Sequence, residues 1–231
     1  MDPNQLLASR CGALDVSGIR RAFQLGASLK DPINLSIGQP DFAVPKPLQE
    51  AAIQAIEGGR NGYTLTSGAP DLLASVSAHL QQDVGWSCGD ETDVIITSGT
   101  SGALLLAFMA LCEPGTEAIV ADPWFVVYPA LGPMTGATIV PCNTYPDFRM
   151  TAERVEPLLT DRTRVVLLNT PSNPTGVVST AEEVKDLAAL CASRGVMLIS
   201  DEIYDLFTFQ DGRDGPGASP SPARFTRDML L

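Results

Sequence analysis

Short apolar runs alternate with amphipathic stretches through the middle of the chain. Residues 165–168 and 196–199 are continuous apolar runs, and the segment between them has the spacing of an amphipathic helix. An apolar run without alternation is typical of a strand that is buried on both faces of a sheet. The order strand, helix, strand therefore predicts a βαβ unit with parallel strands.

The rest of the chain continues this alternation. Helices are predicted over residues 45–58, 70–84 and 151–159, and another begins at Thr100; strands are predicted over residues 93–97, 117–121 and 138–141. These elements predict an α/β fold, a three-layer sandwich with a mainly parallel sheet. Residues 1–33 have weak periodicity and are predicted to form an arm, and residues 34–42 a short strand ending in a turn. The region rich in Gly, Pro, Ser and Asp that follows Phe209 is predicted to be a surface excursion.

Charge and cysteine content exclude several classes of function. The net charge is −12 and no basic stripe occurs, which argues against a nucleic-acid binder and against attraction to an anionic membrane. The five cysteines are far apart, and His79 is the single histidine, so no metal site is predicted. Reduced thiols fit a cytoplasmic protein. No apolar stretch is long enough to span a bilayer.

Polar residues follow the predicted strands at the positions where α/β proteins bind ligands. Asn173 and Asp201 come just after two such strands, so both are expected to face one crevice. Gly99, Thr100 and Ser101 open a helix, where free N–H groups and small side chains suit a phosphate. The alternative for residues 99–101 is ordinary helix capping, and the alternative for Asp201 is a loop or cap carboxylate. Neither a P-loop nor a dinucleotide motif is present.

Two motifs in this region resemble those of a known family. NPTG at residues 173–176, followed by DEIY at residues 201–204, resembles the class I/II aminotransferases, which are fold-type I enzymes that depend on pyridoxal 5'-phosphate. The resemblance runs from about residue 34 to residue 231. It implies amino-group transfer between an amino acid and a 2-oxo acid, and a homodimer. It also implies that residues 1–44 form an N-terminal arm and the start of a small domain, and that residues 45–231 form an incomplete cofactor-binding domain, with the C-terminal small domain absent.

The resemblance assigns a role to each matching residue around the cofactor ring. Asp201 would pair with the pyridine nitrogen, and Tyr204 would donate a hydrogen bond to the phenolic oxygen. Asn173 would contact the same oxygen and also the substrate carboxylate. Phe125 would stack on the ring, and Trp124 is the alternative stacking residue.

Three further expectations come from the same resemblance. Tyr63 would reach across the dimer interface to the cofactor phosphate of the other subunit, and the backbone of Gly38 would lie near the substrate carboxylate. The lysine that forms the Schiff base in the family is expected just beyond Leu231. The three lysines of the chain are expected to face solvent, and the chain alone is therefore expected to form no Schiff base; they are Lys30, Lys46 and Lys185.

The residues leave two other functions open. One is a non-catalytic truncated relative that binds the cofactor weakly or pairs with a full-length partner. The other is a carbon–sulfur lyase that uses pyridoxal phosphate on the same fold, since the motifs quoted do not separate lyases from aminotransferases.

Overall fold

A four-stranded parallel sheet forms the centre of the computed structural model. The model describes residues 3–14, 25–26, 29–31, 33, 38, 40–89, 92–213 and 219–231. The strands are β1 (Glu117–Asp122), β2 (Thr138–Asn143), β3 (Thr163–Asn169) and β4 (Met197–Asp201). Their order across the sheet is β2-β1-β3-β4, and every pair is parallel. All four carboxyl ends therefore lie along one edge.

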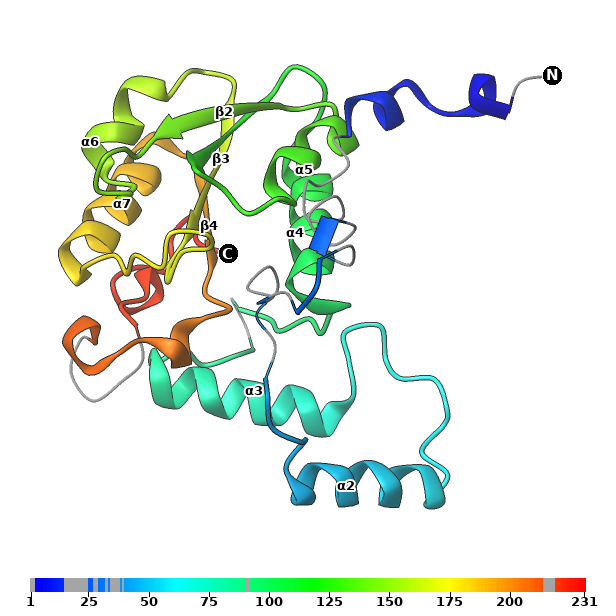
Figure 1. The fold of residues 1–231 in the computed structure, drawn as a ribbon. Coiled ribbons are helices and arrows are strands. Elements are labelled where there is room, and N and C mark those ends of the chain that lie inside the picture. Colours follow the sequence, from blue (N-terminus) through cyan, green and yellow to red (C-terminus); the bar gives the residue numbers. More distant parts are fainter. Residues whose placement is uncertain are drawn as a thin grey trace.

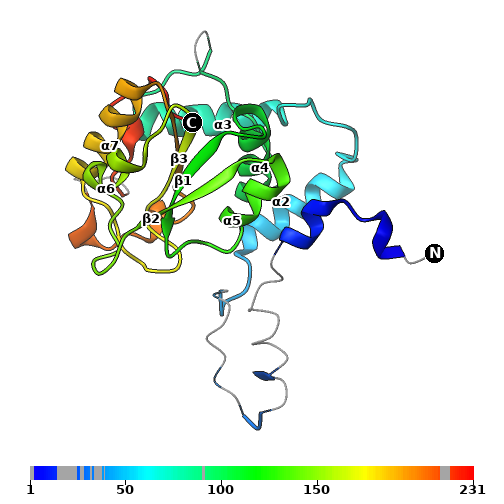
Figure 2. The same cartoon turned by 90° about the horizontal axis from the view of Figure 1, so that it is seen from above.

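Helices cover both faces of this sheet (Figures 1 and 2). On one face lie α4 (Gly99–Leu111) and α5 (Tyr128–Thr135), and on the other α6 (Ala152–Val155) and α7 (Ala181–Arg194). The arrangement confirms the predicted three-layer α/β sandwich, because parallel strands joined by crossover helices need a cover on each side.

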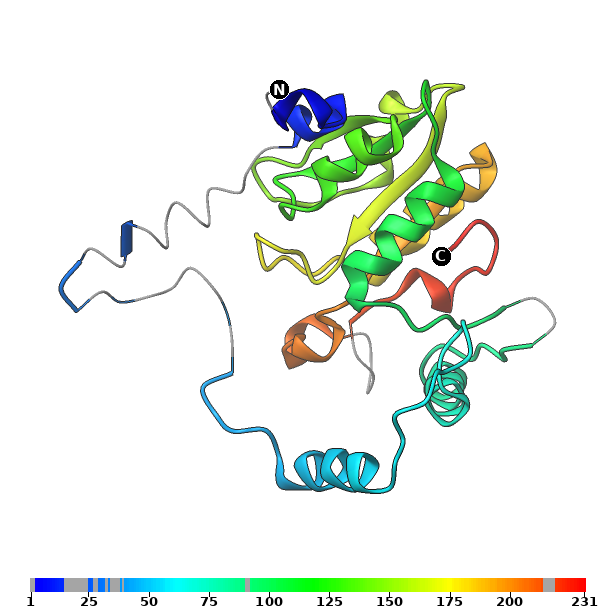
Figure 3. The same ribbon diagram turned by 90° about the vertical axis from the view of Figure 1, so that its right-hand side faces the viewer.

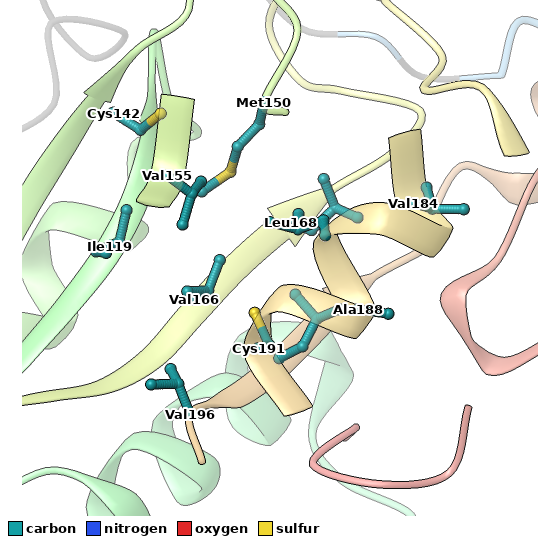
Figure 4. Close-up of a cluster of buried hydrophobic side chains, with 12 residues drawn as sticks. Ile119, Cys142, Met150, Val155, Val166, Leu168, Val184, Ala188, Cys191 and Val196 are labelled. Carbon is teal, nitrogen blue, oxygen red and sulfur yellow. The ribbon is translucent and has the colours of Figure 1, made fainter. Parts of the chain in front are cut away.

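The core consists of two apolar clusters, one on each side of the sheet. Alternate strand residues face opposite sides, so Ile119 and Val166 belong to the cluster under α6 and α7, whereas Val120 and Val165 belong to the one under α4 and α5. Figure 4 shows the first cluster, in which Cys191 of α7 lies against the strand side chains. The strands are thus buried on both faces, as their unbroken apolar sequences predict.

Helix α7 is fixed at both ends by local sequence signals. The Thr180 hydroxyl accepts from the Glu183 N–H at 3.2 Å, and the Glu183 carboxylate accepts from the Thr180 N–H at 2.7 Å, which is a capping box. Gly195 ends the helix in the left-handed region, with φ of 63°. These signals set where the chain turns into β4.

The segment before α4 lies outside this sandwich. It contains α2 (Lys46–Glu57) and α3 (Pro70–Asp83), both predicted, each with a proline in its first turn and neither with a buried residue. Figure 3 shows α2 standing apart from the sheet.

Several expectations on local structure need correction. The predicted strand over residues 93–97 is not formed; the Ile96 N–H donates to the Ser67 carbonyl at 2.7 Å instead. A strand needs a neighbour to complete its ladder, and no described segment pairs with this one.

The predicted helix over residues 151–159 is split into α6 and a 3-10 turn at Glu156–Leu158, where Pro157 lacks the N–H that an α-helix needs. Helix α5, which includes Gly132 and Pro133, was not predicted.

Predictions for the two less regular regions are tested only in part. Most of residues 1–37 lie outside the described residues, including most of the predicted strand at 34–42; the described portion of the arm has 3-10 turns at Pro3–Leu6 and Ser9–Ala13. The excursion after Phe209 is exposed at first, but Ser219 and Ser221 are buried. The chain then returns along β4, where the Leu198 N–H donates to the Met229 carbonyl at 2.7 Å.

Candidate functional site

The carboxylate of Asp201 is buried at the carboxyl end of β4. Its residue is only 8% exposed. Oδ2 accepts a hydrogen bond from the Tyr128 hydroxyl at 2.8 Å, and Oδ1 accepts a longer one from the Ile203 N–H at 3.3 Å. No ion pair to Asp201 occurs within the described part of the chain. A carboxylate removed from water in this way has donors but lacks the cation that usually accompanies burial.

Tyr128 is a site residue that the sequence reasoning missed. It begins α5, is 3% exposed, and donates to Asp201. Burial raises the pKa of Tyr128 far above its ordinary value, and the nearby Asp201 carboxylate raises it further. The hydroxyl therefore stays protonated and remains a donor at any working pH. The sequence does offer one signal, because Tyr128 comes three residues after Phe125 in the aromatic-rich segment that follows β1.

Phe125 lies beside this pair. Its ring meets that of Tyr128 edge to face, with centroids 5.6 Å apart and planes at 82°. Phe125 and Trp124 are both partly buried and both pack against the core cluster under α4 and α5. The predicted stacking residue thus contacts the tyrosine that donates to the buried carboxylate, and Trp124 stays open as the alternative.

Asn173 and Tyr204 approach each other across the gap between the turn after β3 and the turn after β4. Asn173 Nδ2 donates to the Tyr204 hydroxyl oxygen at 3.4 Å, a long hydrogen bond. Tyr204 is 36% exposed. The two polar side chains predicted from NPTG and DEIY therefore lie together.

Asn169, the last residue of β3, connects these two turns. Its Nδ2 donates to the Asp201 backbone carbonyl at 2.9 Å, and its Oδ1 accepts from the Asn173 N–H at 2.7 Å. Asn169 was also absent from the predicted site. Its position, directly opposite Asp201 in the β3–β4 register, depends on strand pairing that a single sequence does not give.

The predicted phosphate cup is at the start of α4. Gly99 has φ of 68°, and its carbonyl accepts from the Thr97 hydroxyl at 2.8 Å. Ser98, the residue before the helix, makes no capping bond with its side chain, and Gly99, Thr100 and Ser101 are exposed. The first N–H groups of α4 thus have no side-chain cap, which argues against the alternative that these residues only cap the helix.

The start of α4 and the end of β4 lie at the same end of the domain in Figures 1 and 3. No hydrogen bond within the described residues joins the α4 start to Asp201, so their use by one ligand stays a prediction. Two surface cavities of about 240 and 300 Å³ have other linings, with Arg149 and Arg213 in one and Arg164 and Arg194 in the other.

Within the described residues, the remaining predicted residues have no hydrogen bond or ring contact with this group. Tyr63 is fully exposed in the loop between α2 and α3, which Figures 1 and 3 show away from the sheet. Gly38 is exposed and has open space around its Cα. The three lysines are exposed, as predicted: Lys30, Lys46 and Lys185.

The geometry of the site defines a class of protein. A parallel α/β sheet that brings a buried carboxylate, an amide and two tyrosines to its carboxyl edge has the layout of a small-ligand site. Comparison with known proteins then gives the family. Residues 30–225 match the family model described as aminotransferase class I and II, and the chain belongs to this family. Members of this family use pyridoxal phosphate.

Relatives share this assignment. The chain is 35% identical over 226 residues to a protein named probable aspartate aminotransferase from Methanocaldococcus jannaschii, covering 98% of this chain and 58% of the relative. It is 37% identical to one named probable N-acetyl-LL-diaminopimelate aminotransferase from Bacillus subtilis, covering 88% and 52%. Among solved structures, aspartate aminotransferase from Thermus thermophilus with maleate superposes with a TM-score of 0.87 at 32% identity, covering 97% and 58%. The chain spans little more than half the length of these relatives.

Within the described residues, no helix has both the length and the apolar character needed to cross a membrane.

Proposed function

We propose that this chain is the cofactor-binding part of a pyridoxal-phosphate-dependent aminotransferase. The observation that carries the proposal is the Asp201 carboxylate, which is buried and hydrogen-bonded but has no cationic partner within the described residues. A protonated pyridine nitrogen supplies the missing charge, and the other side chains at this edge suit the other parts of the same cofactor. The residues present therefore fit the group.

Each part of the chain would hold one part of the cofactor. The free N–H groups and hydroxyls at Gly99, Thr100 and Ser101 suit the phosphate, because a helix start carries partial positive charge. Phe125 offers a ring face, with Trp124 as the alternative. Asp201, kept in place by Tyr128, would hold the proton on the ring nitrogen.

Asn173 and Tyr204 would hold the opposite side of the ring. Both carry donors that can reach a ring oxygen, and they already lie within 3.4 Å of each other. When bound, pyridoxal phosphate supplies an electron sink for the electrons released as the substrate loses its α-proton. The contribution of these residues is to orient that sink and to keep it positively charged.

The proposed substrates are an amino acid and a 2-oxo acid. Relatives carry names that refer to aspartate, prephenate, aromatic amino acids and N-acetyl-LL-diaminopimelate, which is too wide a range to propose one amino acid here. Asn173 is proposed to contact the substrate carboxylate, and the Gly38 backbone to lie near it.

The proposed assembly is a homodimer in the cytoplasm. Tyr63 is fully exposed and distant from the Asp201 group, which suits a residue that serves the site of a second copy. The five cysteines are all unpaired, which suits a reducing compartment. Residues 1–44 are proposed to be the arm and the start of a small domain, and residues 45–231 the cofactor-binding domain.

Reduction with borohydride in the presence of pyridoxal phosphate tests the part played by the lysines. Because all three lysines are exposed, we expect saturable cofactor binding without a single stoichiometric pyridoxyl-lysine in the peptide map. A stoichiometric adduct at one of them, with measurable amino transfer by this chain, would show that the proposed arrangement is wrong.

Activity is tested in a protein that extends this chain with a lysine-bearing C-terminal half. Amino transfer from an amino acid to a 2-oxo acid is expected there, with a large loss in the Asp201→Ala variant. Release of ammonia and a thiol in place of amino transfer would favour the carbon–sulfur lyase. Cofactor binding with neither reaction would favour the non-catalytic relative.

A further inference from the structure

The side-chain amide of Asn169 has only one orientation that satisfies both of its partners. One partner is the Asp201 carbonyl, which can only accept, and the other is the Asn173 N–H, which can only donate. A flipped amide would place nitrogen against N–H and oxygen against carbonyl, losing both bonds. The amide therefore acts as a bridge of fixed direction between the ends of two site-bearing segments.

This bridge adds to the other bonds between the turn after β3 and the end of β4, one of which is the long bond from Asn173 Nδ2 to the Tyr204 hydroxyl. The turn after β3 closes on itself, because the Gly176 N–H donates to the Ser172 carbonyl at 2.8 Å. On the other side, the Asp201 carbonyl also accepts from the N–H of Thr170, the residue after β3, at 3.2 Å. The bond from the Asn173 N–H to Asn169 Oδ1 fixes the backbone of the turn at Asn173 itself to the end of β3, opposite Asp201.

We propose that Asn169 is a positioning residue that sets the distance between the Asn173 side chain and the Asp201 carboxylate. The two groups would then meet one ring from opposite sides, and this second step rests on the proposed function. Other side chains do not replace the bridge. Aspartate keeps the acceptor for the Asn173 N–H but sets an oxygen against the Asp201 carbonyl, and leucine loses both bonds.

The coupling is tested without cofactor by NMR on the whole chain. Asn169→Leu is expected to speed hydrogen exchange at the Asn173 amide about five- to tenfold, the effect of losing one hydrogen bond. Exchange at the Gly176 amide, which belongs to the turn itself, should stay unchanged and shows that the turn is still folded. The Asp201 carbonyl carbon resonance should also shift.

Two further variants separate the halves of the bridge. Asn169→Asp should leave the Asn173 amide protected but still shift the Asp201 carbonyl resonance. The matched control is Asn143→Asp at the end of β2, whose Oδ1 accepts from the Tyr145 N–H at 3.0 Å and has no bond to the site. That control should change neither signal. If the leucine variant does not fold, the carbonyl shift in the aspartate variant decides the outcome.

Titration with pyridoxamine phosphate tests the consequence for the ligand. Its dissociation constant should rise about fivefold or more in both Asn169 variants and stay unchanged in the control. Unchanged exchange and an unchanged Asp201 resonance in a folded Asn169→Leu protein would overturn the coupling. Changed NMR signals with wild-type affinity would overturn the positioning role. If the variants change the NMR signals but the wild-type chain itself binds no pyridoxamine phosphate, the result would count against the proposed function and leave the coupling intact.

Discussion

Tyr128 donates a hydrogen bond to the side chain of Asp201, which is buried. A carboxylate inside a protein loses its hydration, and a short bond from a hydroxyl restores part of that loss. The hydroxyl is a dependable donor because its pKa is raised by burial and by the neighbouring carboxylate. At the scale of single residues, the site therefore depends on a side chain that lies outside both recognisable motifs.

Replacing this hydroxyl should destabilise the fold. Tyr128→Phe is expected to lower the free energy of unfolding by about 1.5–3 kcal/mol, because it removes a hydrogen bond to a buried charged group. Urea denaturation measures the change. Tyr145→Phe is the matched control, since Tyr145 is 54% exposed and its hydroxyl has no hydrogen bond to the described residues. Equal effects of the two substitutions would show that the bond to Asp201 has no special weight.

At the scale of secondary-structure elements, the ends of α7 and β4 matter most. Thr180→Ala removes the hydroxyl from the capping box of α7 and should cost about 1 kcal/mol of unfolding free energy. Thr180→Ser keeps a hydroxyl at the same place and should recover most of that loss. Thermal denaturation of the three proteins checks this. A serine variant no better than the alanine variant would contradict the assigned role of the cap.

Glu202 joins the end of β4 to the segment that returns along it. Its Oε1 accepts from the hydroxyls of Ser200 at 2.7 Å and Ser221 at 2.8 Å. Burial raises the pKa of Glu202, and the negative charges of Asp205 and Asp83 raise it further, while the two hydroxyls oppose the shift without cancelling it. The folded protein thus disfavours the charged form of this side chain.

The sign of the pH effect follows from this shift. Glu202 contributes most to stability below its ordinary pKa, and the contribution is lost as the pH rises through the folded-state pKa. Glu202→Gln does not titrate, so its stability relative to wild type should increase as the pH rises from about 4, the ordinary pKa of glutamate, through the folded-state pKa. Urea denaturation across this range measures it, with Glu113→Gln in an exposed loop as control. A difference that is flat with pH, or that declines, would contradict the raised pKa.

The sequence predicts elements well where local signals and burial agree, as in β3, α7 and β4. It fails where an element depends on a partner. Residues 93–97 have a strand composition but find no neighbouring strand, and α5 combines Gly132 and Pro133 yet packs against the sheet. For the site, Asn173 and Asp201 were predictable from the strand-end rule, whereas Asn169 was not and Tyr128 offered only its spacing from Phe125. Their roles arise from strand register and helix packing, which a single sequence does not specify.

At the scale of the whole molecule, α4 exposes an apolar face. Leu106 is 56% exposed and Met109 is 64% exposed, and three-residue spacing places them on the same side of the helix. Ile95 in the preceding segment is 63% exposed. An apolar face of this kind favours association with other protein surfaces.

The chain is therefore expected to self-associate at micromolar concentrations and above. The double variant Leu106→Gln, Met109→Gln should shift the population towards monomer in sedimentation velocity experiments. Leu6→Gln, Leu7→Gln is the matched control, because those side chains are equally exposed but lie in the N-terminal arm. A monodisperse wild-type monomer with a sharp cooperative melt would refute the expectation.

The central claim is that the buried Asp201 carboxylate holds a protonated pyridine ring at the carboxyl edge of the sheet. Calorimetric titration with pyridoxamine phosphate tests it most directly, because this form of the cofactor cannot form an imine with exposed lysines. We predict saturable binding at one site per chain, at least about tenfold weaker in Asp201→Asn, which keeps the size of the side chain but removes its charge. The exposed Asp186→Asn on α7 should bind as wild type does. Absence of saturable binding, or equal affinity of the Asp201→Asn and wild-type proteins, would contradict the account.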